Sequence, residues 1–270
     1  MPFDFQPARA PLAGTVRAFW AFREAPGEGA REPERIVPDG CTEIVVHFGD
    51  PFTEGGALAP QPRAIFAGQI TAPLWLRPGA AIDVVGVRFE PGGARRLGLP
   101  PQSHLADLRI AFEDLLAPPL RTLWSETTDR MAHAAGFPAR VRLLERFLSR
   151  ALRREPVDGI DACVRSIESG GGALSLDRAA TLASLSTRQM QRRFLADVGM
   201  SPKLFARVVR FQRVFDRWHE GDENWSGIAL ACGYYDQAHL LRDFRQFAGE
   251  PPSAFLAALA PLSGAFLERR

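Results

Sequence analysis

Three polar side chains in the N-terminal third of the chain could form a reactive or metal-binding set. Cys41, Glu43 and His47 occupy alternate positions, so a strand here would turn all three toward one face. A thiol nucleophile needs a positioned base and an orienting third group. A metal-binding barrel typically offers a His-x-His pair with further ligands. Neither arrangement is identifiable, so we expect no catalytic site, no metal and no cofactor.

Two other interpretations of this inner face stay open. It could line a pocket for a small molecule, or packed side chains could simply fill it. The residues predicted for such a pocket are Cys41, Glu43, His47, Trp75 and Arg88. The remaining cysteines, Cys163 and Cys232, form no Cys-x-x-Cys pair, so the pattern indicates neither a disulfide framework nor a zinc site. We expect each cysteine to be a small buried side chain.

Chemistry of a different kind is indicated in the C-terminal third, where one pattern occurs twice. A short apolar helix is followed by a three-residue break and then by a helix whose exposed face carries Gln and Arg. The first copy spans residues 176–194 with its break at 184–186, and the second spans residues 228–244 with its break at 232–234. This pattern is typical of a helix-turn-helix.

The ends of the two copies and the segment between them support the same prediction. Gly199 and Gly249 stand where a helix C-cap needs positive φ, and prolines follow both. Gly233, in the second break, is also expected at positive φ. An amphipathic helix over residues 203–219 would span on the order of 25 Å. It could hold two recognition helices about one duplex turn apart.

The second copy resembles the second-motif signature of the AraC/XylS family of bacterial transcription regulators. The similarity runs through Gly-Tyr-Tyr-Asp-Gln-Ala-His-Leu-Leu-Arg-Asp-Phe-Arg at 233–245, with Gly249 and Pro251-Pro252 behind it. The first copy matches through Ser186, Met190, Arg192, Phe194, Gly199 and Ser201-Pro202. The family more often has Ser and Phe where this chain has Ala238 and Leu240. The resemblance implies a regulator that binds double-stranded DNA, contacts RNA polymerase and more often activates than represses.

The side chains expected to contact DNA lie on the second helix of each copy. Arg can bond guanine and Gln can bond adenine in the major groove, whereas Ala238 and Leu241 could contact only a thymine methyl or a sugar edge. His239 has no second ligand nearby and is predicted to pack or to contact phosphate. The predicted contacts are Thr187, Arg188, Gln189, Gln191, Arg192, Arg193, Gln237, Ala238, Leu241 and Arg242.

The N-terminal half reads as short strands between frequent Gly and Pro turn signals. Strands are expected near residues 15–23, 43–48, 65–69, 74–76 and 82–89, which predicts a small β sandwich or barrel. Helices are expected over 118–134 and 138–154. The apolar stripe of the second helix, which begins at Val141, either faces the core or mediates dimer contacts. Residues 38–43, 68–71 and 85–94 resemble the cupin-like domain of some AraC-type regulators, which implies ligand sensing or oligomerisation.

The predicted fold is α+β with two domains. A β-rich, cupin-like sandwich or barrel with trailing helices occupies residues 1–154, and an all-α domain with two helix-turn-helix motifs joined by a long helix occupies 156–258. Residues 259–270 form a tail. The composition is that of an ordinary globular chain, with 46% hydrophobic and 24% charged residues. A net charge of +2 gives no overall basic signal, so local arginines must carry any attraction for DNA.

No apolar run is long enough to span a membrane and no signal peptide is recognisable, so a cytoplasmic monomer or homodimer is expected. The leading hypothesis is a sequence-specific DNA-binding regulator, and not an enzyme. The alternative is a cupin-like or alkyl-transfer enzyme, or a sensor, that carries a DNA-binding tail. Alkyl transfer would require a cysteine of low pKa, for which Cys41 is the candidate. A further possibility is an interaction module that has kept the helical fold without binding DNA.

Overall fold

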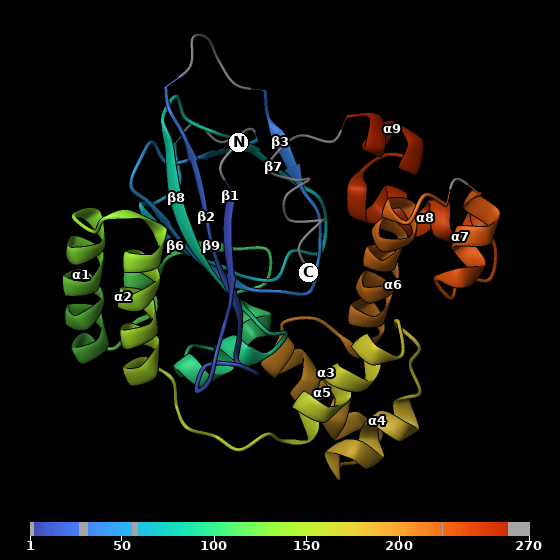
Figure 1. Ribbon diagram of the computed structural model, residues 1–270. Coiled ribbons are helices and arrows are strands. Elements are labelled where there is room, and N and C mark those ends of the chain that lie inside the picture. The colour runs from blue at the N-terminus through green and yellow to red at the C-terminus, as the bar shows by residue number, and fades with distance from the viewer. Residues whose placement is uncertain (1–2, 27–31, 56–58, 223, 259–270) are drawn as a thin grey trace.

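The computed structural model describes residues 3–26, 32–55, 59–222 and 224–258. A β-rich N-terminal part is followed by a helical C-terminal part, and the two lie side by side (Figure 1). The predicted α+β fold class is therefore confirmed. The predicted tail at 259–270 lies outside the described residues. No helix in the described ranges is long and apolar enough to cross a membrane.

Two antiparallel sheets build the N-terminal part. The larger has the order β1-β2-β8-β4-β6-β9 and the smaller has the order β3-β7-β5. The strands of the larger sheet are β1 (Phe3–Pro7), β2 (Val16–Glu24), β8 (Ile82–Phe89), β4 (Glu43–His47), β6 (Ala64–Ala67) and β9 (Arg109–Ala111). Those of the smaller sheet are β3 (Glu34–Ile36), β7 (Leu74–Arg77) and β5 (Thr53–Glu54).

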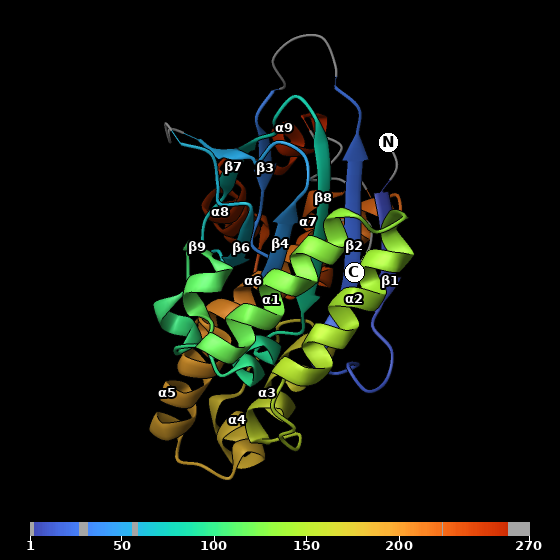
Figure 2. The same cartoon turned by 90° about the vertical axis from the view of Figure 1, so that its left-hand side faces the viewer.

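Alternation along the central strands gives the larger sheet two buried faces. On β4 and β8, Ile44 and Val85 belong to a cluster shared with the trailing helices, whereas Val45 and Val84 belong to a second cluster on the opposite face. The helices α1 (Pro118–Ala132) and α2 (Gly136–Ala151) cover the first face, as Figure 2 shows. The α2 stripe that begins at Val141 is buried in this cluster, so it faces the core rather than a second subunit.

Three short 3-10 turns follow the strands β8 and β9, and the first two pack against the C-terminal part. They are η1 (Gly93–Leu97), η2 (Gln102–His104) and η3 (Phe112–Leu115). Residues 153–158 form neither helix nor strand and lie where the two predicted domains meet. Asp158 then starts α3 (Gly159–Ser169) through a reciprocal capping box with Asp161.

The C-terminal part contains both predicted helix-turn-helix units. The first consists of α4 (Leu176–Ala183) and α5 (Thr187–Val198), and the second of α7 (Trp225–Ala231) and α8 (Gln237–Ala248). The long helix α6 (Pro202–His219) joins them, and α9 (Pro252–Ala257) follows. The two units lie at opposite ends of α6 (Figure 1).

Local capping explains where the recognition helices begin and end. The Ser186 side chain accepts the Gln189 N–H at the start of α5, and the Asp236 side chain accepts the His239 N–H at the start of α8. Gly199 and Gly249 end these helices with φ of 94° and 81°, and Gly233 turns the second motif with φ of 81°. All three positive-φ predictions are confirmed.

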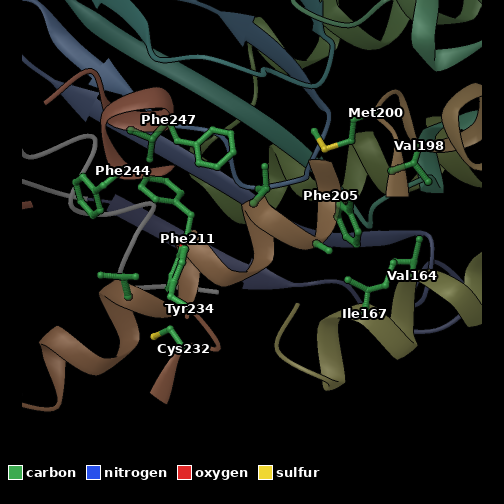
Figure 3. Close-up of a cluster of buried hydrophobic side chains, with 14 of the residues drawn as sticks. Val164, Ile167, Val198, Met200, Phe205, Phe211, Cys232, Tyr234, Phe244 and Phe247 are labelled. Atoms are coloured by element: carbon green, nitrogen blue, oxygen red, sulfur yellow. The ribbon is translucent and has the colours of Figure 1, made fainter. Parts of the chain in front are cut away.

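The helix α6 forms the centre of the C-terminal core. Phe205 packs near Ile167 of α3, whereas Phe211 packs against Phe244 and Phe247 of α8 (Figure 3). The 5.1 Å centroid distance between the Phe211 and Phe244 rings is typical of an edge-to-face pair. One continuous core therefore fixes both motifs to the same helix.

Polar contacts hold the two parts of the molecule together. The Arg95 guanidinium donates two hydrogen bonds to Asp161, at 2.9 and 3.1 Å, and Arg96 donates a third at 2.7 Å. Although burial opposes ionisation, these bonds lower the pKa of Asp161 to about 2. At a separate point, Arg17 pairs with Glu168 at 2.7 Å. The helix α3, which packs against the recognition helix α5, is thus tied to the β-rich part.

Candidate nucleic-acid interface and inner cavity

The N-terminal half of α5 presents the first set of predicted DNA contacts. Arg188 and Arg192 are exposed, and neither forms a hydrogen bond or ion pair with any described residue. Thr187 and Gln191 are half-buried on the same helix. Because an unpaired guanidinium is free to bond a base edge or a phosphate, this end of α5 is suited to contact DNA.

Two predicted contacts on α5 already have partners inside the protein. The Gln189 side-chain oxygen accepts hydrogen bonds from the Ser186 backbone N–H at 3.1 Å and from the Ser186 hydroxyl at 2.8 Å. Arg193 pairs with Asp158 and, at 3.4 Å, with Asp197. Gln189 thus takes part in starting the helix, and Arg193 joins α5 to the beginning of α3. The sequence pattern could not separate these residues from their unpaired neighbours.

The helix α8 presents the second set. Arg242 is exposed and makes no hydrogen bond or ion pair within the described ranges, and the same holds for Arg245 one turn later. The side-chain oxygen of Gln237 accepts a 3.0 Å bond from the Ser226 hydroxyl. Ala238 is exposed and Leu241 is half-buried. The second recognition helix thus offers fewer hydrogen-bonding groups than the first and more apolar surface.

Two exposed apolar side chains extend this surface beyond the predicted residues. Leu230 on α7 is 66% exposed and Tyr235, just before α8, is 87% exposed. Together with Ala238 and Leu241 they line a shallow hollow beside the start of α8. Neither residue is recognisable as a site residue from sequence, because a single exposed Leu or Tyr is common and is informative only together with its neighbours in space.

His239 packs against an aromatic ring. Its ring lies edge-on to Tyr234 with centroids 5.1 Å apart. The described residues contain no group of three or more His, Cys, Asp or Glu side chains able to hold a metal ion. Two further charged residues near the second motif, Arg210 and Asp236, have partners within the protein. Arg210 donates to the Gly172 carbonyl at 3.0 Å and lies over the Tyr234 ring, while Asp236 caps α8.

A cavity of about 110 Å³ lies inside the β-rich part, between its two sheets. Cys41, Glu43 and Arg88 line it, and the last two lie opposite each other on β4 and β8. The rest of the lining is mostly apolar and includes Trp20, Val45, Phe52, Ile65, Leu74 and Leu76. His47 lies outside the lining, with its ring 4.9 Å from that of Phe52. Trp75 also lies outside and is 43% exposed.

The charged groups of the cavity are paired. Arg88 bonds the carboxylates of Asp39 and, at 3.0 Å, Glu43. Arg109 forms a two-point bond with Glu54, both distances being 2.8 Å. Burial raises the pKa of Glu43 to about 8 and that of the Cys41 thiol to about 12. A thiol with so high a pKa is a poor nucleophile at neutral pH.

The cavity also touches the C-terminal part. Gln212 of α6 is part of its lining, and its side-chain amide donates to the Pro38 carbonyl. The turn that begins at Pro38 packs closely on the same helix, since a Cβ placed on Gly40 would stand 2.7 Å from the Phe205 ring. Asp39, in this turn, is the partner of Arg88. A single turn therefore contacts both the cavity and the helix that carries the two motifs.

Family comparisons agree with this architecture. Residues 179–258 match a family described as a helix-turn-helix domain, and residues 4–111 match a family described as a domain of unknown function, DUF6597. No curated protein matches the chain significantly.

Solved structures of ToxT from Vibrio cholerae are similar over most of the chain. A 1.65 Å structure is 10% identical with a TM-score of 0.51 and covers 97% of this chain and 100% of that one. A ToxT structure from strain O395, bound to (E)-4-(8-methylnaphthalen-1-yl)but-3-enoic acid, is 9% identical with a TM-score of 0.49 and covers 96% and 100%. At this identity the likeness concerns the fold alone.

Two helix-turn-helix units on one connecting helix, behind a β-rich domain, define a DNA-binding transcription regulator. The C-terminal domain is a helix-turn-helix domain of the AraC type, as its sequence resemblance indicated, and the N-terminal domain is consistent with a cupin-like fold.

Proposed function

We propose that this protein binds DNA sequence-specifically, with α5 and α8 entering two successive major grooves. The observation that carries the proposal is the set of exposed arginines without partners among the described residues, which lie on these two helices. They are Arg188 and Arg192 on α5, and Arg242 and Arg245 on α8. If these helix faces were merely solvated, there would be no reason for exposed, unpaired arginines to occur on the second helix of both units.

The length of α6 supports a two-groove arrangement. Its 18 residues extend about 27 Å at 1.5 Å per residue. Successive major-groove sites on one face of DNA are ~34 Å apart. Because the recognition helices pack at opposite ends of α6, their separation is suited to neighbouring grooves.

The two helices differ in the contacts they are suited to make. On α5, Arg188, Gln191 and Arg192 could bond base edges, and Thr187 and Gln189 would lie close to the phosphates. Arg193 is exposed but paired with Asp158 and Asp197. On α8, Gln237 and Arg242 supply the polar contacts. Ala238 and Leu241, extended by Leu230 and Tyr235, form an apolar surface suited to a thymine methyl.

The β-rich domain is proposed to sense a small molecule that alters DNA binding. The inner cavity is the candidate site, with Cys41, Glu43 and Arg88 in its lining. A ligand that displaces the turn beginning at Pro38 would act on α6 through Gln212 and Phe205. We also propose that the protein activates transcription by contacting RNA polymerase, as regulators of the AraC/XylS family more often do.

Binding of the full chain to its own upstream DNA, compared with scrambled DNA, tests the proposal. We expect a preference of about 10³-fold or more in fluorescence anisotropy, together with a steep loss of affinity as salt rises. Equal, weak binding to the two DNAs at every salt concentration would contradict sequence-specific recognition. A preference without salt dependence would contradict the role of the arginines.

The alkyl-transfer alternative receives no support from the cavity. Such chemistry requires a thiolate, and burial raises the pKa of Cys41 to about 12. Thiol titration of the native protein tests this directly. We expect slow modification of Cys41. Rapid modification at neutral pH would instead support the hypothesis of an alkyl-transfer enzyme.

A further inference from the structure

We propose that the inner cavity selects a small uncharged molecule, about one ring in size and carrying a hydroxyl or amide donor, in preference to a carboxylate or an amine. The inference rests on the proposed sensing role of the β-rich domain and specifies the chemical class of its ligand. It follows from the size of the cavity and from the pairing of every guanidinium in its lining.

The volume limits the ligand to a small molecule. A cavity of ~150 Å³ lined by apolar side chains holds one benzene molecule. The cavity here is about 110 Å³ and is partly open, so a ring with one short substituent is the expected size. The apolar lining, with Trp20, Phe52 and Ile65 among its members, suits the faces of such a ring.

Three guanidiniums border the cavity, and carboxylates of the protein neutralise all of them. Arg88 bonds Asp39 and Glu43, and Arg109 bonds Glu54 at two points. Arg35 pairs with Glu250, donates to the Ala248 carbonyl at 2.5 Å and lies 4.6 Å from the Trp75 ring centroid. The three positive charges are thus matched by three carboxylates if Glu43 is protonated, and by four if it is ionised.

Neither sign of charge finds a partner in such a lining. A ligand carboxylate would have to displace a protein carboxylate or remain buried without a cation, and either outcome is unfavourable. An ammonium ligand would meet carboxylates that are already bonded to guanidiniums. A hydroxyl or amide N–H needs only a spare acceptor position, which the oxygens of Asp39 and Glu43 retain because each carboxylate has about four lone-pair sites.

Three probes of matched size separate these cases: benzyl alcohol, benzoate and benzylamine, measured against the full chain at pH 7 by ligand-observed NMR titration. We expect benzyl alcohol to bind at least about tenfold more tightly than either charged probe, a difference of about 1.4 kcal/mol. Perturbation of the Trp20 indole N–H resonance, assigned by its loss in Trp20→Phe, would place the probe in the cavity.

Removing the carboxylate partner of a guanidinium in the cavity should change the relative affinities for benzyl alcohol and benzoate. In Asp39→Asn one partner of Arg88 is lost, and in Glu54→Gln the partner of Arg109 is lost. Either change should shift the ratio of affinities toward benzoate by at least about tenfold, since a buried cation then lacks its counter-charge. Glu220→Gln is the matched control, because it breaks only the exposed Arg217–Glu220 pair on the surface. It should leave the ratio unchanged.

Several outcomes would overturn the proposal. Benzoate binding as tightly as benzyl alcohol would contradict the pairing argument. Binding of none of the probes, or binding that leaves the Trp20 resonance unmoved, would contradict the assignment of the cavity as the site. DNA binding of the full chain without any probe is measured separately. A protein that recognises its operator yet ignores all three probes therefore refutes this inference and leaves the DNA-binding proposal standing.

Discussion

The arginines of this protein fall into two groups, according to whether a carboxylate lies beside them. Arg95 and Arg96 bond Asp161 and hold the two parts of the molecule together. Arg188 and Arg192 have no partner among the described residues and remain available to an external anion. The net charge of +2 conceals this division, because paired and unpaired arginines count equally in a composition.

Replacing Arg192 with Ala tests the unpaired group. We expect a loss of about 1–3 kcal/mol in specific affinity, with relaxed preference at one base pair, since one bidentate contact disappears. Affinity for a set of operator variants, measured by anisotropy, would show this pattern. Arg130→Ala is a matched control, because Arg130 is exposed on α1, away from both recognition helices. Uniform weakening on every sequence would instead identify a phosphate contact.

His47 should make the stability of the protein depend on pH. Burial lowers the pKa of its ring to about 4, below the ordinary value of 6.5. As pH falls from about 6.5 to 4, the His47 ring therefore binds a proton in the unfolded chain but stays neutral in the folded chain. Stability should decline by up to about 3 kcal/mol over this interval and be unaffected above it. The free energy of unfolding of His47→Leu, measured by urea unfolding at several pH values, should fall less steeply as pH decreases. A pH dependence equal to that of the native protein would contradict the assignment to His47.

At the scale of elements, the recognition helices depend on short-range capping and on one shared support. Ser186 and Asp236 start them, and Gly199 and Gly249 end them. The aromatic residues of α6 then fix their positions, as the packing of Phe211 on Phe244 illustrates. The turn between the two helices of each motif sets the angle between them. The residue with positive φ differs between the two turns. The first turn uses Ser184 at φ 52°, and the second uses Gly233.

Gly233→Val should destabilise the second motif. The glycine has φ of 81°, and a Cβ there would meet only the Arg210 side chain at 3.6 Å. Since space is available, the cost is backbone strain, of the order of 1–2 kcal/mol or more for a β-branched residue. Gly233→Asn, whose side chain tolerates this conformation, should recover most of the loss. Equal stability of the Val variant and the native protein, measured by thermal unfolding, would refute the argument.

At the scale of the whole molecule, the two parts have largely separate cores, and mainly polar contacts cross the boundary between them. The cluster of buried residues around α6 takes Val37 from the β-rich part, and its other members come from residue 160 onward. The boundary itself consists of ion pairs such as Arg17–Glu168 and hydrogen bonds such as that from Gln212 to Pro38.

A fragment of residues 156–270 should therefore fold alone and bind DNA, though more weakly than the intact chain. It retains nearly all of its own core and both capped recognition helices, and it loses the ion pairs made by Arg95 and Arg96. Circular dichroism should show cooperative thermal unfolding of a helical protein. A fragment without a cooperative transition would contradict the proposed division into domains at residues 154–156.

The sequence by itself determined the features that depend on neighbours along the chain. Helix periodicity, caps and obligatory glycines act over a few residues, so α4 to α8, their turns and the alternation of β4 and β8 were predictable. The strands β1, β3, β5 and β9 were not predicted. The last three have only two or three residues and owe their existence to a partner strand, and β1 is held by its pairing with β2. Tertiary structure alone decided that α2 faces the core, that Arg193 is paired while Arg192 is not, and that Trp75 lies outside the cavity. Each of these depends on residues distant in sequence, whose charge or bulk becomes relevant only when folding brings them within contact distance.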